Sequence, residues 1–314
     1  MAGAFTHFMI CYESRDKKYG LIPELKSILF NSSEFLYLGA VSPDLPYLSF
    51  KGGKINWADV MHYEKTNSIA IDGHNNLKKD WAKLKDDHEE HIKLAWLFGF
   101  ISHLIADATI HPIVEAEVGP YHESEENRKN HRICEMTQDS LIFKKVRNQE
   151  IDRAEFSSYI KLCGESSYRS SLFNYWRGNM IMNYSNKGEI PNPKLWFETY
   201  TEVIDIVENG LGSFSRHIGS GTGYVYQTSE EIISNHPDLH ERYYTNITLP
   251  DGRKGDFYTQ GFLNAVKNVV GIWNKLYEGM DKNIDVSGLI KNWNLDNGVD
   301  IDLLATIKTF WNPA

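Results

Sequence analysis

Cysteine is scarce, and its placement excludes the structures that depend on it. The 314 residues contain three cysteines, Cys11, Cys134 and Cys163, which lie far apart in the chain. A disulfide framework requires an even set at regular spacing, and a cysteine-based zinc site requires pairs a few residues apart. We therefore expect all three to be small buried residues, as suits a protein of a reducing compartment.

Long apolar segments and secretion signals are missing as well. The most apolar stretch, LAWLFGFISHLIADATI, contains His103 and Asp107 and is flanked by charge, which disfavours a membrane-spanning helix. The start, MAGAFTHFMICYESRDKK, has no basic first segment, no long apolar centre and no small-residue cleavage site, so it does not read as a signal peptide. We expect a cytoplasmic protein as the sequence stands, and a secreted one if the chain is a trimmed mature form.

Positive charge is in deficit. Lys and Arg number 33 against 42 Asp and Glu, which gives a net charge of −9. This balance disfavours a broad surface that tracks nucleic-acid phosphates. It remains compatible with a metal-centred nucleic-acid site, because bound zinc would carry the local positive charge.

Alternating strand patterns are also rare. The best candidate is Glu241 to Leu249, which can equally be an extended loop. Apolar residues recur instead at the three- and four-residue spacing of helices. These helical patterns cover Lys79 to Ile110, Arg132 to Asn148, Ala154 to Cys163, Ser170 to Tyr184, Lys194 to Asn209 and Tyr258 to Tyr277. Because no repeat or long linker divides the chain, we predict one all-α domain over residues 1–314.

The most informative feature that is present is a row of polar residues in the apolar stretch. His103, Asp107 and His111 follow one another at intervals of four, which places them on one face of a helix. A buried carboxylate is costly unless it is paired or bound to metal. His111 would lie roughly 12 Å along the axis from His103 and so serve a different ion. Pro112 is expected to end or kink the helix, which could move His111 off the row.

Further candidate ligands occur on both sides of this row. His131 and Glu135 in HRICE have the same interval of four, a pattern that a surface ion pair would also produce. His7 and His62 lie in apolar or helical surroundings, where core histidines are common, and Asp44 in GAVSPDLPY could be a turn or cap residue. Histidine nitrogens and carboxylate oxygens are the ligands that zinc takes when cysteine is absent. Histidines in polar surroundings, among them His122, are set aside.

Together these residues resemble the zinc-dependent phospholipase C family, which includes bacterial phosphatidylcholine-hydrolysing phospholipases, clostridial alpha-toxin and fungal and plant single-strand nucleases. The elements, in the order of the family, are His7, GAVSPDLPY, His62, H-x-x-x-D followed by His-Pro, and H-x-x-x-E. They lie in residues 1–140, and residues 141–314 add further helices. The resemblance implies an all-helical fold with a cleft for three zinc ions. No C-terminal lipid-binding β-sandwich is expected, because Leu211 to Ala314 reads as helix and loop.

The resemblance also implies a ligand set for up to three zinc ions. One ion would be held by Asp44, His62, His103 and Asp107, and a second by His111, His131 and Glu135. The third would be held by His7, a second oxygen of Asp107 and the backbone of Met1 or Ala2. Ala2 or Met1 stands where the mature family members commonly begin with Trp.

The implied activity is that of a zinc-dependent phosphodiester hydrolase, most similar to phospholipase C. Two zinc ions roughly 3.5–4 Å apart would generate a hydroxide that attacks phosphorus in line. Asp44 would bind metal and also orient or deprotonate the water. The substrate would be a phospholipid or another phosphodiester, with peripheral membrane contact.

Two alternatives stay open at this point. One is a single-strand nuclease of the same superfamily, which would need aromatic slots that stack bases. Phe35, Tyr47, Trp57, Tyr63 and Tyr121 lie near the ligand motifs, although each could simply pack in the core. The other alternative is a non-catalytic helical protein that retains metal for stability.

Overall fold

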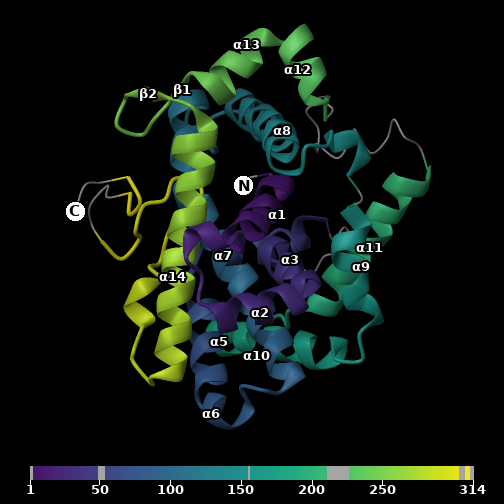
Figure 1. Ribbon diagram of the computed structural model, residues 1–314, viewed down its shortest axis with the longest axis vertical. Helices are drawn as coiled ribbons and strands as arrows, with labels where there is room; N and C mark the ends of the chain where they lie inside the picture. The colour runs from purple at the N-terminus through teal and green to yellow at the C-terminus, as the bar shows by residue number, and fades with distance from the viewer. Residues whose placement is uncertain (1–2, 49–53, 155, 211–225, 304–307, 312–314) are drawn as a thin grey trace.

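The computed structural model describes residues 3–48, 54–154, 156–210, 226–303 and 308–311 (Figure 1). Within these ranges 71% helix is distributed over 14 α-helices, and the predicted all-α class is confirmed. One two-stranded antiparallel sheet pairs Ile247 with Gly255 and Thr248 with Lys254.

The α-helices are α1 (Ala4–Ser14), α2 (Pro23–Asn31), α3 (Ser33–Val41), α4 (Trp57–Tyr63), α5 (Ser68–Lys78), α6 (Trp81–Leu84), α7 (His88–Val118), α8 (Glu125–Arg147), α9 (Phe156–Glu165), α10 (Arg169–Tyr184), α11 (Pro193–Gly210), α12 (Ser229–Asn235), α13 (Pro237–His240) and α14 (Leu263–Asp281). Short 3-10 or π-helical turns are η1 (Lys17–Tyr19), η2 (Leu45–Leu48), η3 (Ile151–Arg153), η4 (Ser185–Lys187), η6 (Glu241–Thr245), η7 (Phe257–Phe262) and η8 (Ser287–Leu289). The strands are β1 (Ile247–Thr248) and β2 (Lys254–Gly255).

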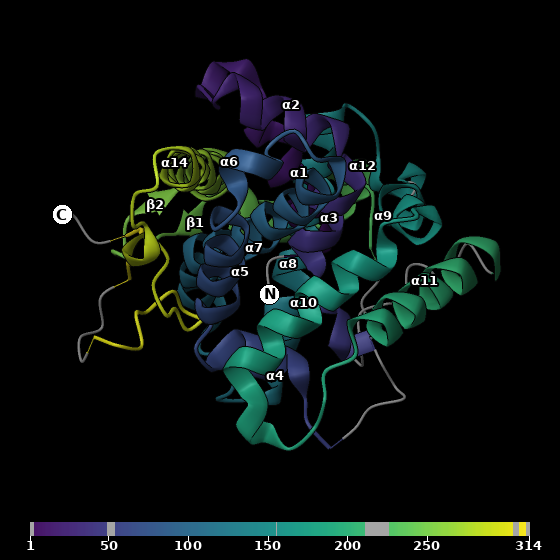
Figure 2. The ribbon, with the colours of Figure 1, turned by 90° about the horizontal axis from the view of Figure 1, so that it is seen from below.

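α7 is the central helix, and α1, α3, α5, α8 and α14 pack around it (Figures 1 and 2). Its first turn is capped by Asp87, whose side chain accepts hydrogen bonds from the amides of Glu89 and Glu90, as helix starts require. Its length and composition are those of a membrane-spanning helix, and its most apolar window is 100% buried inside the protein. The core helix of a soluble protein has the same properties.

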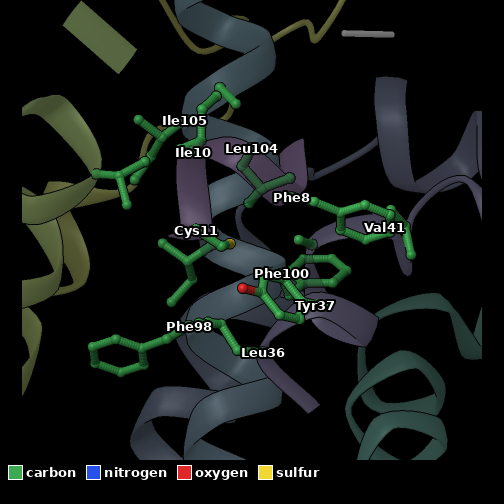
Figure 3. Packing of buried hydrophobic residues seen from close by; sticks show 14 of the residues in the cluster. Phe8, Ile10, Cys11, Leu36, Tyr37, Val41, Phe98, Phe100, Leu104 and Ile105 are labelled. Atoms are coloured by element: carbon green, nitrogen blue, oxygen red, sulfur yellow. The ribbon is translucent and has the colours of Figure 1, made fainter. Parts of the chain in front are cut away.

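α3 and α7 cross with their backbones in contact. A side chain at Gly39 would collide with the carbonyl of Trp96, and one at Gly99 with the carbonyl of Leu36. Glycine at both positions therefore allows the close approach. Aromatic and aliphatic side chains of α1, α3 and α7 fill the core around this crossing (Figure 3).

Pro112 was predicted to end or kink the helix, and the first of these is wrong, because α7 continues to Val118. Proline cannot donate to the carbonyl of the residue four positions earlier, Ala108. Gly298 lies against that carbonyl, and the indole of Trp311 donates to the next one, Thr109 O, at 2.7 Å. The C-terminal segment thus covers the part of α7 that proline would otherwise weaken.

Other boundaries differ in detail from those predicted. The range Lys79 to Ile110 is divided into α6 and α7 by a turn that contains the α7 cap, and α8 begins at Glu125 rather than Arg132. Glu241 to Leu249 forms a π-helical turn before the two residues of β1, so it is neither a full strand nor a plain loop. The three cysteines are buried with free thiols, as expected.

Candidate metal centre

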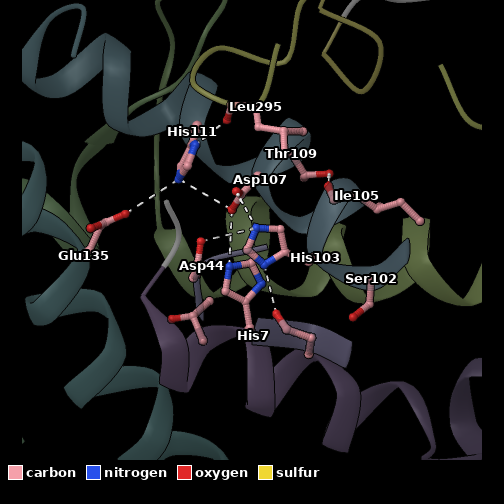
Figure 4. A network of polar contacts seen from close by, with 12 residues as sticks. His7, Asp44, Ser102, His103, Ile105, Asp107, Thr109, His111, Glu135 and Leu295 are labelled. Atoms are coloured by element: carbon pink, nitrogen blue, oxygen red, sulfur yellow. Dashed lines mark hydrogen bonds and ion pairs between the residues drawn. The ribbon is translucent and has the colours of Figure 1, made fainter. Parts of the chain in front are cut away.

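Eight polar side chains from five parts of the chain converge beside the middle of α7. Figure 4 labels His7, Asp44, His103, Asp107, His111 and Glu135 of this set. α7 contributes three of them, one from each successive turn, and α8 contributes two. The others come from α1, from the turn after α3 and from α4. They are His7, Asp44, His62, His103, Asp107, His111, His131 and Glu135, the side chains proposed from the sequence. The backbone of Met1 or Ala2, the remaining predicted ligand, lies outside the described residues.

These side chains form three groups, in each of which the ligand atoms lie within 4.8 Å of one another. The groups are Asp44, His62 and His103; His7, His103 and Asp107; and His111, His131 and Glu135. Seven of the eight residues are at most 2% exposed, whereas the Asp44 side chain is 18% exposed. Three histidine-carboxylate groups in a buried position match the donor chemistry of zinc.

Asp107 lies between the groups. Its Oδ1 is 3.3 Å from Nε2 of His7 and 3.5 Å from Nε2 of His111. Its Oδ2 is 3.2 Å from Nε2 of His103 and 3.9 Å from Nε2 of His62. One carboxylate therefore faces four imidazoles, and His111 stays on the row despite Pro112.

Backbone carbonyls fix the orientation of three of these imidazoles. Nδ1 of His62 donates to Ala58 O at 2.7 Å, Nδ1 of His103 donates to Ala40 O at 2.9 Å, and Nδ1 of His111 donates to Leu295 O. A carbonyl only accepts, so each neutral ring turns the lone pair of Nε2 towards the carboxylates. Two facing acceptors need a proton or a cation between them. This outer hydrogen bond is the one that metal-binding histidines make.

Several buried polar atoms of the three groups make no hydrogen bond within the part of the chain that the structure describes, which also fits bound cations. Nε2 of His111, Oδ1 of Asp44 and both ring nitrogens of His7 have no hydrogen-bond partner among the described residues. Unpartnered buried polar atoms are rare in proteins, because they lose their hydration without compensation. Their positions in all three groups fit cations bound in each of them.

Most of the pKa shifts in the groups favour the protonation states that metal ligands need, namely ionised carboxylates and neutral imidazoles. Burial alone would raise the pKa of Asp107, but His111 and His103 hold it well below the usual range. Burial also lowers the pKa of His131 to about 4, so this ring is neutral at pH 7 and ready to bind metal. For His103, burial is outweighed by the Asp107 and Asp44 carboxylates, which raise its pKa to about 9. A bound cation would replace the proton that His103 otherwise takes.

Aromatic residues lie beside His62 of the Asp44 group and beside His131 of the His111 group. The ring of Tyr47 lies 5.7 Å from that of His62, with its hydroxyl donating to Asp59 at 2.8 Å. The rings of Tyr63 and His62 lie 6.1 Å apart, and those of Tyr121 and His131 lie 5.0 Å apart. Trp57 and Phe35, also considered from the sequence, are core residues, 4% and 2% exposed.

The C-terminal segment supplies site residues that the sequence did not point to. Besides the Leu295 carbonyl, Asp296 accepts from the Tyr63 hydroxyl at 3.1 Å and lies 3.1 Å from Nε2 of His122. The polar sequence around His122 gives no sign of a role near the site, and neither does the sequence around Asp296. The Asn-Gly turn at 297–298 marks a reversal of the chain, but no local signal says what that turn contacts.

Gly298→Ala is expected to weaken the zinc centre through this segment. Gly298 has φ +70°, and a Cβ there would collide with the Ala108 carbonyl and the Pro112 ring. We expect a loss of roughly 2–4 kcal/mol in unfolding free energy. Zinc affinity should fall about 10–100-fold, because the carbonyl that orients His111 moves away. Chemical denaturation and zinc competition titrations measure the two effects.

Gly252→Ala is the matched control for backbone strain. Gly252 has φ +84°, and a Cβ there would meet no atom within 4 Å in the part of the chain described. This variant should lose only about 1 kcal/mol and keep its zinc affinity. Equal losses in the two variants would contradict the role assigned to the contact with α7.

Comparison with known proteins agrees with this geometry. The zinc-dependent phospholipase C family matches residues 6–186, which is more than half of the 314 residues. The matched span contains all eight side chains of the three groups, whereas Leu295 and Asp296 lie beyond it. No curated protein and no solved structure matches the chain. The chain belongs to the zinc-dependent phospholipase C family.

Proposed function

We propose that this protein hydrolyses the phosphodiester bond of phospholipids by the reaction of a phospholipase C, with up to three zinc ions held by the three groups. Family membership supports a hydrolase of this type. The observation that carries the proposal is the buried Asp107 carboxylate, which faces imidazoles of all three groups within 3.9 Å. Such a carboxylate can bridge neighbouring ions with its two oxygens.

When bound, zinc supplies positive charge for the phosphoryl oxygens and a strongly nucleophilic water at neutral pH. Residues of the chain would orient the water and the substrate. Asp44 is the one of the eight side chains that reaches solvent, and its Oδ1 lies 3.2 Å from Nε2 of His62. Burial raises the pKa of Asp44, but His103 and His62 bring it below its usual value. Asp44 is therefore ionised at neutral pH and able to accept a hydrogen bond from a water at the open side.

The border of the site favours a substrate with a cationic group beyond the phosphate. The rings of Tyr47 and Tyr63 lie beside His62, and their hydroxyls donate hydrogen bonds to the carboxylates of Asp59 and Asp296. Aromatic faces and carboxylates together attract ammonium and quaternary ammonium groups. The same rings could stack nucleic-acid bases, but the net charge of −9 disfavours a polyanion.

Turnover of two substrates by the zinc-loaded protein tests this proposal. We expect release of the chromophore from a chromogenic phosphocholine ester, abolished by chelation and restored by zinc, with little cleavage of single-stranded DNA. Preferred cleavage of DNA would support the nuclease alternative instead. Stoichiometric zinc with turnover of neither substrate would overturn the enzymatic proposal in favour of a metal-stabilised scaffold.

A further inference from the structure

The start of α1 is held by a side chain of another helix. The first amides of a helix have no partner within the helix, and the cap residue of α1, Gly3, has no side chain to supply one. Asp139 of α8 takes this place. Its carboxylate accepts from the amides of Phe5 and Thr6 at 3.4 and 2.7 Å, and from the Thr6 hydroxyl at 2.7 Å.

The Asp139 carboxylate is completely buried, and both of its oxygens accept hydrogen bonds. Asp139 is 0% exposed and Thr6 is 1% exposed. The hydroxyl of Tyr226, beyond the span matched by the family, donates to Oδ2 of Asp139 at 2.7 Å. Gly3 is packed so closely that a Cβ there would collide with the carboxylate. Asp139 is therefore engaged in hydrogen bonds to α1 and Tyr226 and belongs to none of the three metal groups.

His7 follows Thr6 directly and depends on the same turn. Its amide donates to the Gly3 carbonyl at 3.2 Å. Its ring stacks on that of His103 with centroids 4.2 Å apart, and its Nε2 lies 3.3 Å from Asp107. His7 is the one ligand that α1 contributes to the three groups. The first turn of α1 thus determines whether the His7, His103 and Asp107 group is complete.

We propose that Asp139 is a positioning residue of the zinc centre, which docks the first turn of α1 on α8 and thereby holds His7 in ligating position. The inference rests on the zinc site proposed above. It makes the ion of the His7 group dependent on the α1–α8 junction, whereas the other two groups contain no residue of α1. Loss of Asp139 should therefore release one ion selectively.

Zinc content is the principal test. We expect Asp139→Ala to retain one zinc ion fewer per chain than the wild type after dialysis against a weak chelator, with that ion bound about 10–100-fold more weakly. Asp139→Asn should restore binding, because its amide can accept from Thr6 and donate to Tyr226. Global folding should survive, since Phe5 still packs on Phe143 with ring centroids 5.4 Å apart.

Two further variants separate positioning from general destabilisation. Ser140→Ala removes a buried hydroxyl of α8 that donates to Met136 O within the same helix, so it should retain all of its zinc. Gly3→Ala should lose the same ion as Asp139→Ala, but cost nothing further in the Asp139→Ala background, where the collision is gone. Equal zinc content in Asp139→Ala and the wild type would overturn the proposal. Zinc-loaded protein without turnover would instead contradict only the proposed function.

The junction also predicts a pH dependence in zinc-free protein. Burial raises the pKa of Asp139 to about 6 from a model-compound value of 3.8, against the opposing effects of Thr6, Tyr226 and Arg132. Because the folded state favours the protonated carboxyl group, Asp139 contributes fully to the free energy of unfolding below pH 3.8. This contribution is lost as the pH rises through 6. Between pH 4.5 and 7.5, the folding equilibrium constant of the wild type should fall roughly 30-fold relative to Asp139→Asn. A constant ratio would show that the pKa of Asp139 is not raised in the folded protein.

Discussion

Asp107→Asn should abolish most of the activity and reduce the zinc content by more than one ion. Each oxygen of Asp107 faces a different set of imidazoles, Oδ1 those of His7 and His111, and Oδ2 those of His103 and His62. Asparagine keeps the volume but replaces one oxygen by an amide nitrogen, which donates protons and does not bind zinc. Whichever oxygen is replaced, the imidazoles that lose it belong to two different groups, so more than one ion should be affected. We expect turnover of the phosphocholine ester to fall at least ~100-fold. Replacing a residue that only hydrogen-bonds to a metal ligand already lowers activity by up to about this factor, and Asp107 would be a ligand itself.

Two comparisons show whether the loss comes from the shared position of Asp107. Ser102→Ala, on the same helix, removes a buried hydroxyl that donates to Gly99 O and should leave zinc content and turnover unchanged. Asp44→Asn should also lower turnover, but remove at most one ion, because Oδ1 of Asp44 lies 3.2 and 3.8 Å from Nε2 of His62 and His103, which are the other two members of its own group. Full zinc content and full turnover in Asp107→Asn would contradict the assignment of this residue as the bridge.

The row on α7 was predictable because helix periodicity is a local property. An interval of four residues places His103, Asp107 and His111 on one face whatever surrounds the helix. The apolar neighbours further predict that this face is buried, as it is. The convergence of Asp44 on the row depends on the close crossing of α3 and α7, and that of His62 depends on the position of α4; no spacing in the sequence specifies this arrangement. The resemblance to the family supplied it instead.

Residues that act through tertiary contacts could not be predicted in this way. The local effect of Pro112 is to end or kink a helix, but its outcome in α7 also depends on the C-terminal segment, which covers the carbonyls of Ala108 and Thr109. The Leu295 carbonyl acts through its backbone, so no residue type announces it. Asp139 occurs in the middle of an apparently ordinary helix, and its role depends on the start of a helix more than 130 positions earlier in the chain.

Removal of zinc is expected to lower the melting temperature substantially. Eight histidine and carboxylate side chains are gathered in the interior, where charged groups are costly unless they are neutralised by partners. An ion present at 1,000 times its dissociation constant stabilises the folded state by about 4 kcal/mol. For two or three ions in a chain of this size, we expect a decrease of roughly 10–20 °C on chelation. Calorimetry with and without chelator measures the difference.

The size of this decrease should follow the number of ions that a variant still holds. Asp107→Asn, which starts with fewer ions, should lose less on chelation than the wild type, and Asp139→Ala should be intermediate. Zinc in excess of the chelator should restore the wild-type melting temperature, while magnesium should not, because it prefers oxygen ligands in octahedral geometry. A chelated wild type that melts at the temperature of the zinc-loaded protein would mean that protons alone neutralise the cluster. In that case the paired imidazoles and carboxylates would be a structural network, and the facing Nε2 and carboxylate atoms would share hydrogens rather than metal.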